Sequence, residues 1–136
     1  MSALTQGRQT ARRSGDLLTL PVAASKTCYG GGLACRDASG NATPGATATT
    51  LKALGAFRET VDNSAGAAGA VSVDIEKGIF RFANSATTDL ITAADIGNDA
   101  YIVDDQTVAK TNATNTRSVA GKIFDVDTLG VWIDLR

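Results

Sequence analysis

The chain contains no histidine. Histidine is the side chain most often used as a general base near neutral pH, and it is the commonest metal ligand. Without it, neither a Ser–His–Asp nor a Cys–His nucleophilic set can be built. The only cysteines are Cys28 and Cys35, and two thiolates without a histidine are too few for a zinc site. We therefore expect a protein that is not an enzyme and that binds neither a metal nor a cofactor.

Long apolar segments are also missing. No apolar run approaches the roughly 18 residues that suggest a membrane-spanning helix. The first 16 residues, MSALTQGRQTARRSGD, lack the apolar region of a secretory signal. These features predict synthesis in the cytoplasm and no membrane partner.

Charge is nearly balanced, with 13 Lys+Arg against 14 Asp+Glu. That balance argues against a broadly basic nucleic-acid surface. The charges are nevertheless unevenly distributed along the chain. Arg8, Arg12 and Arg13 all precede the first acidic residue, Asp16. Residues 1–15 are too polar to fold alone, so we predict a flexible basic N-terminal arm that orders on a partner. Residues 16–136 are predicted to form a single β-domain.

The central stretch Ala70–Ala83 shows the alternation of a half-buried strand, but the alternation changes phase across Glu76–Gly78. Its apolar residues have odd numbers first and even numbers afterwards: Val71, Val73 and Ile75, then Phe80 and Phe82. One interpretation is a single strand with a β-bulge and Gly78 at positive φ. The other is two strands joined by a tight turn. We favour the bulge.

Short alternating segments recur along the rest of the chain, and turn residues separate them. We predict strands over Asp16–Ala23, Leu33–Cys35, Thr49–Thr60, Tyr101–Val103, Thr107–Lys110, Val119–Val126 and Val131–Leu135. Pro21 places the first strand at a sheet edge or near its own end. Leu51, Ala53 and Phe57 share a parity and are expected on one face.

The remaining segments are predicted as loops and turns. The only helical signal is Thr92–Gly97, a capping-box pattern that spans barely one turn. Val61–Ala70 is rich in Gly and Ala, and nothing in it fixes a loop shape. Many short strands with almost no helix predict an all-β fold, a small β-barrel or β-sandwich.

Three other patterns have functional interpretations that we weigh against structural ones. Cys28 and Cys35 flank Gly30–Gly32, so a disulfide is geometrically feasible, although free thiols are favoured in a cytosolic protein. Neither Gly30–Gly32 nor Gly66–Gly69 leads into the Gly-Lys-Ser/Thr ending of a phosphate-binding loop. Asp104 and Asp105 do not have the spacing of an EF-hand calcium site. Loop flexibility and turn formation explain these last two patterns more simply.

Trp132 is the most informative single residue. Val131, Ile133 and Leu135 occupy one face of the last predicted strand, so Trp132 lies on the other face. An outward tryptophan is either covered by a local loop or placed at a contact between proteins, where tryptophan is enriched. Both interpretations stay open at this stage.

Several stretches resemble, in order, a family of small tailed-phage head proteins that were formerly labelled RecA/RadA-like recombinases. They are DLLTLPVAAS, Val71-Ser72-Val73 through Gly78-Ile79-Phe80, Asp95-Ile96-Gly97 to Ala100–Asp105 with Val108, and Ala120-Gly121 to Val131-Trp132-Ile133. The similarity covers roughly residues 16–136. A recombinase would need a nucleotide-binding loop, which this sequence lacks.

The resemblance implies a compact β-module that decorates and stabilises the outside of a phage capsid. Its partners would be the major capsid protein and copies of itself, as a trimer or, second, a dimer. Arg8, Arg12, Arg13 and Trp132 are the predicted contact residues. The alternatives are a head–tail joining or tail component, and a small nucleic-acid-binding barrel whose arm follows phosphates.

Overall fold

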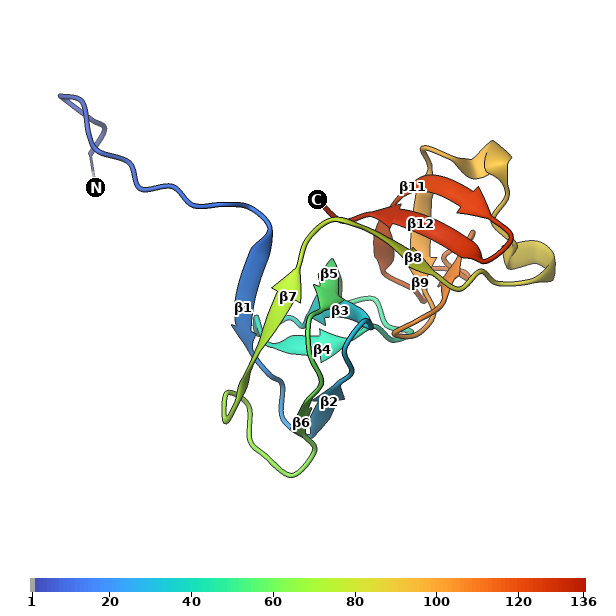
Figure 1. The fold of residues 1–136 in the computed structure, drawn as a ribbon, viewed down its shortest axis with the longest axis horizontal. Coiled ribbons are helices and arrows are strands. Elements are labelled where there is room, and N and C mark those ends of the chain that lie inside the picture. The colour runs from blue at the N-terminus through green and yellow to red at the C-terminus, as the bar shows by residue number, and fades with distance from the viewer. Residues whose placement is uncertain (1) are drawn as a thin grey trace.

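The computed structural model describes residues 2–136 and shows an all-β protein, which confirms the predicted fold class (Figure 1). The strands are β1 (Leu17–Pro21), β2 (Lys26–Cys28), β3 (Leu33–Arg36), β4 (Ala42–Pro44), β5 (Lys52–Phe57), β6 (Val61–Asn63), β7 (Ser72–Glu76), β8 (Ile79–Phe82), β9 (Asp99–Ile102), β10 (Val108–Ala109), β11 (Val119–Asp127) and β12 (Gly130–Asp134). Two 3-10 turns, η1 (Thr87–Asp89) and η2 (Ala93–Asp95), lie between β8 and β9.

The two halves of the chain build separate five-stranded sheets. The first sheet has the strand order β1-β7-β5-β3-β4 and uses only strands that precede residue 77. The second has the order β10-β9-β11-β12-β8 and uses only strands that follow residue 78. A two-stranded ribbon, β2-β6, belongs to the first half. All pairings within these sheets are antiparallel.

The segment Glu76–Gly78 is not a bulge, so the favoured interpretation of the central stretch was wrong; the stretch forms two strands, as in the alternative, but they do not form a hairpin with each other. β7 pairs with β1 and β5, whereas β8 pairs with β12 in the other sheet. Gly78 does not have a positive φ. The apolar alternation changes phase because the chain leaves one sheet at Glu76 and enters the other at Ile79 (Figure 1).

Each sheet curls until its two edge strands meet at a single parallel bridge. In the first sheet, Val22 just after β1 bridges to Ala42 at the start of β4. In the second, Ala83 just after β8 bridges to Thr107 just before β10. These single contacts do not close either sheet into a barrel. β1 is an edge strand that ends at Pro21, as predicted.

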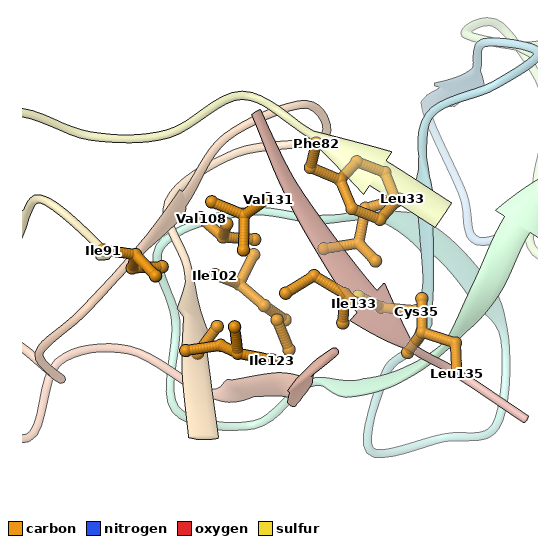
Figure 2. Packing of buried hydrophobic residues seen from close by; sticks show 12 residues of the cluster. Leu33, Cys35, Phe82, Ile91, Ile102, Val108, Ile123, Val131, Ile133 and Leu135 are labelled. Atoms are coloured by element: carbon orange, nitrogen blue, oxygen red, sulfur yellow. The ribbon is translucent and has the colours of Figure 1, made fainter. Parts of the chain in front are cut away.

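The larger hydrophobic core lies between the two sheets (Figure 2). The second sheet contributes most of it, including Ile102, Ile123 and Ile133, all at most 2% exposed. Leu33 and Cys35 of β3 enter the same core from the first sheet. This shared packing joins the halves into one hydrophobic unit.

A second core lies on the opposite face of the first sheet, under the β2-β6 ribbon. It contains Val73, Ile75 and Phe57 together with Cys28 from the ribbon. Ala34 also faces this side, so β3 is buried on both faces. Such burial explains why β3 is a continuous apolar run instead of an alternating one.

Leu51, Ala53 and Phe57 do not lie on one face, contrary to the prediction, because β5 contains a bulge. Ala34 is opposite Gly55 and Cys35 is opposite Ala53, which leaves Leu54 as the extra residue. The extra residue reverses the alternation. Leu51 and Ala53 therefore pack on the core between the sheets, whereas Phe57 packs on the second core.

The loop that follows β6 has a fixed shape, contrary to the prediction for Val61–Ala70. The side chain of Asn63 is buried, and its Nδ2 donates to the carbonyl oxygens of Ala23 and Ala67, each at 3.0 Å. A Cβ at Gly66 would lie 1.9 Å from Asn63 Oδ1, so the loop passes directly over this amide. One buried asparagine therefore organises a segment that looked featureless.

The predicted helical turn at Thr92–Gly97 is the 3-10 turn η2. The Thr92 backbone N–H donates to Asp95 Oδ2 at 2.9 Å, which is the expected capping interaction, and Gly97 follows with φ +95°. The closing hairpin of β11 and β12 also lies where the sequence predicts it, around Asp127–Gly130. Residues 2–16 precede the first strand, and the chain there extends away from the body (Figure 1).

Candidate interaction surface

The predicted contact residues form two separate groups. Arg8, Arg12 and Arg13 lie in the arm, are exposed, and take part in none of the ion pairs or side-chain hydrogen bonds of residues 2–136. Trp132 lies on β12 in the second sheet, away from the projecting arm (Figure 1). The structure therefore does not bring the arginines to the tryptophan.

Trp132 lies on the outer face of the second sheet, as its parity predicts. Val131 and Ile133 are fully buried and Leu135 is 6% exposed, so these three form the inner face. Trp132 itself is only partly buried. Its neighbours across the strands are Arg81 of β8 and Asp125 of β11.

Two charged side chains fix the tryptophan ring in place. The indole Nε1 donates to Asp127 Oδ2 at 2.8 Å, and the Arg81 guanidinium lies over the ring, 5.4 Å from its centroid. This second contact is a cation–π interaction. Arg81 also approaches Asp127, with Nη1 3.9 Å from Oδ2. The ring is therefore held rigidly and stays accessible on its remaining side, which reduces the entropy lost when a partner packs on it.

Hydrogen bonds lower the pKa of Asp127 below its usual value. The largest contribution is the bond from the Trp132 indole, followed by the backbone N–H of Leu129 and of Gly130. These two N–H groups donate to Asp127 Oδ1 at 2.8 and 3.0 Å and close the hairpin turn. The carboxylate thus links the turn between β11 and β12 to the orientation of the tryptophan.

A shallow apolar groove adjoins the tryptophan. Ile79, Phe124, Asp125 and Trp132 line it, with a volume of about 340 Å³. Phe124 is 54% exposed and is the extra residue of a bulge, because Ile123 is opposite Ile133 while Asp125 is opposite Trp132. Bulges commonly redirect a side chain at a functional surface. Here the bulge turns a phenylalanine outward beside the tryptophan.

Sequence reasoning did not find Ile79, Arg81, Phe124 and Asp127 as members of this surface. Phe124 has the opposite parity to Ile123, so its outward direction could be read from the predicted strand. Arg81 required the pairing of β8 with β12, which the sequence does not contain, whereas Asp127 lies in the predicted hairpin turn close to Trp132. The part of the surface that comes from β8 therefore depends on a pairing between strands far apart in the sequence.

The backbone N–H groups of the glycine-rich segment Gly30–Gly32 already donate hydrogen bonds within the protein, so they are not free to bind a phosphate. The N–H groups of Gly30, Gly31 and Gly32 donate to Thr60 Oγ1, the Phe57 carbonyl and the Tyr29 carbonyl. A phosphate cradle needs such groups free to face the anion. Asp104 accepts from the Gln106 N–H in a turn, and residues 2–136 contain no group of three or more potential metal-ligating side chains.

The two cysteines are free and buried in different cores. Burial raises the pKa of the Cys28 thiol to about 11 and that of Cys35 to about 12. The reactive form of a cysteine is the thiolate, so neither side chain is suited to chemistry near neutral pH.

Comparison with family models, curated proteins and solved structures found no match to this chain. Within residues 2–136, no helix has the length and apolar character needed to cross a bilayer.

Proposed function

We propose that this protein is a structural virion protein that decorates and stabilises the outside of a tailed-phage capsid, without catalytic activity. The observation that carries the proposal is the contrast between a well-packed β-body and an exposed, cationic arm whose three arginines form no ion pair with any of residues 2–136. An arm of this kind contributes little to its own fold and orders only on a partner. The ordered resemblance of residues 16–136 to phage head proteins supports the same function.

The proposed partners are the major capsid protein and copies of the protein itself, as a trimer or a dimer. The arm orders against one of these, with Arg8, Arg12 and Arg13 facing carboxylates. The outer face around Trp132 provides a second, apolar contact. Repetition over the shell then gives avidity that a single weak contact does not supply.

Deletion of residues 1–14 tests the role of the arm. Thermal unfolding of the β-body should hardly change, because none of residues 2–14 belongs to either hydrophobic core. Occupancy on purified heads, measured by electron microscopy and gel densitometry, should fall sharply. A truncated protein that still decorates heads fully would refute the proposal for the arm.

The matched variant replaces Arg8, Arg12 and Arg13 with alanine and keeps the arm length. It should lower occupancy less than the deletion does, with the largest effect at low salt, because exposed ion pairs are weak and screened. Steeply salt-dependent DNA binding that disappears with the arm would favour the nucleic-acid alternative instead.

Trp132→Ala tests the outer face. The monomer should stay folded, because the ring lies outside both cores. Binding to heads or between copies should weaken by about 2 kcal/mol or more, in the range of interface hot spots. Binding is measured by sedimentation with heads, and folding by circular dichroism. An unfolded monomer would show that Trp132 serves as local cover.

A further inference from the structure

A cationic cleft lies where the two halves of the molecule meet, away from the Trp132 surface. It has a volume of about 330 Å³ and is walled by β5, the start of β11 and the end of the chain after β12. Four basic side chains line it: Lys52, Lys77, Lys122 and Arg136. The only acidic side chains in the lining are Asp99 and Asp134. The side chains that line the cleft thus carry an excess of two positive charges, on a protein whose side chains sum to a net charge of −1.

Internal contacts fix three of the four cations without using all their donors. Lys122 Nζ lies 2.8 Å from Asp99 Oδ1, and Arg136 Nη2 lies 2.9 Å from Asp134 Oδ2. Lys77 Nζ donates to the Leu54 carbonyl at 2.7 Å. An ammonium has three donors and a guanidinium five, so each retains N–H groups for another acceptor. Lys52 is exposed and forms no ion pair with any of residues 2–136.

An unpaired strand edge borders the same cleft. β3 pairs with Lys52–Ala56 on one side of β5, but β7 pairs on the other side only with Ala56 and Phe57. β7 stops there because the chain turns away at Lys77 to enter the second sheet. No strand among residues 2–136 pairs with the first half of β5 on that side, where the Lys77 ammonium occupies the Leu54 carbonyl. An exposed sheet edge is a docking site for an extended peptide.

We propose that this cleft binds an extended acidic peptide segment of a partner protein. The positive lining would face the carboxylates of the segment, and its backbone would lie along the edge of β5 at Lys52–Leu54. Leu54 and Val119 line the cleft as well and offer apolar contacts for alternate side chains. A nucleic acid fits less well, because no aromatic residue in the lining can stack on a base and because Asp99 and Asp134 oppose continuous phosphates.

The inference rests on the proposed function only in one respect, since in a decoration protein the acidic segment belongs to the capsid. Peptide binding is measured on the purified full chain without heads. Failure to bind the peptide would therefore leave the arm and Trp132 experiments unaffected, and a protein that does not decorate heads can still bind the peptide.

The probe is a six-residue peptide of alternating glutamate and valine with blocked ends. Its affinity is measured by titration calorimetry, with parallel titrations of the glutamine–valine peptide, inorganic pyrophosphate and a short single-stranded DNA. The test variant is Lys52→Glu combined with Lys122→Glu. The control is Lys26→Glu combined with Arg58→Glu, an equal charge change at exposed residues outside the lining. The Arg8, Arg12 and Arg13 alanine variant controls for binding to the arm.

The acidic peptide should bind in preference to the other three probes and shift the backbone amide resonances of Lys52–Leu54. The cleft variant should weaken binding about tenfold or more, and more than the arm variant does, while the control variant changes it less than about twofold. Absent binding, equal loss in the control variant, or tighter binding of DNA or pyrophosphate would each overturn the proposal.

Discussion

The two halves of this molecule use the same number of strands in their main sheets but bury them differently. In the first sheet β3 is buried on both faces, against the second sheet on one side and in the core that includes the β2-β6 ribbon on the other, whereas β1 and β7 leave one face open to solvent. The second sheet is covered only on its inner face and exposes Phe124 and part of Trp132 on the outer one. The difference places a strand that is buried on both faces in the first half and an exposed pair of aromatic side chains in the second.

Coverage by a shared core also implies that the halves depend on each other. Leu33 and Cys35 belong to the first sheet but are buried against the second. Removing either sheet would expose these side chains to water, at a cost that scales with the apolar area exposed. We therefore expect the β-body to unfold as one cooperative unit.

The largest effect is expected from Ile75→Ala. Ile75 is fully buried in the core of the first half, so the substitution should lower the free energy of unfolding by about 2–5 kcal/mol. The only tryptophan, Trp132, reports on the second half. Its fluorescence midpoint in urea should fall together with the circular dichroism midpoint. An unchanged fluorescence midpoint would show that the halves unfold separately.

A smaller effect is expected from Asn63→Ala, which removes the amide that organises the loop after β6. The carbonyls of Ala23 and Ala67 lose their side-chain donor, and we expect a loss of about 1–3 kcal/mol in the free energy of unfolding. Ala65→Ser, an exposed change in the same loop, is the control. Equal stability of the two variants, measured by urea unfolding, would contradict the role given to Asn63.

The smallest effect concerns the outer face at low pH. Because the folded pKa of Asp127 is lowered, its ionised form favours the fold. This contribution is present above the ordinary pKa of 3.8 and is lost as the pH falls through the lowered value. Protonation should alter the fluorescence of Trp132 below pH 3.8, before global unfolding. Asp127→Asn should remove that step, and a step that persists in the variant would assign it to another carboxylate.

Local patterns in the sequence predicted most of the strands and the inner and outer faces of β12. The alternation of Val131, Trp132 and Ile133 needs only the geometry of one strand. The hairpin at Asp127–Gly130 and the turn at Thr92–Gly97 likewise depend on neighbouring residues. Such features follow from local rules, and the structure confirms them.

Features that depend on distant partners could not be predicted in the same way. The phase change at Glu76–Gly78 was correctly located, but a bulge and a change of sheet give the same sequence pattern. Nothing in the sequence around Leu54 indicates that it is the extra residue of a bulge in β5. The role of Asn63 depends on Ala23, forty residues away. Part of the candidate surface also depends on a distant partner, because Arg81 contacts Trp132 only through the pairing of β8 with β12.

The order of the two sheets along the chain has a consequence for synthesis on the ribosome. Every strand of the first sheet has been translated once Glu76 has been added, and a chain generally folds from its N-terminal part as it emerges. β1 must nevertheless wait for β7, because Leu17–Pro21 pairs with Ser72–Glu76. Until β8–β12 follow, Leu33 and Cys35 remain uncovered, and so the nascent first half presents an apolar face. The interval between translation of β7 and of β12 is therefore when this protein is most exposed to aggregation.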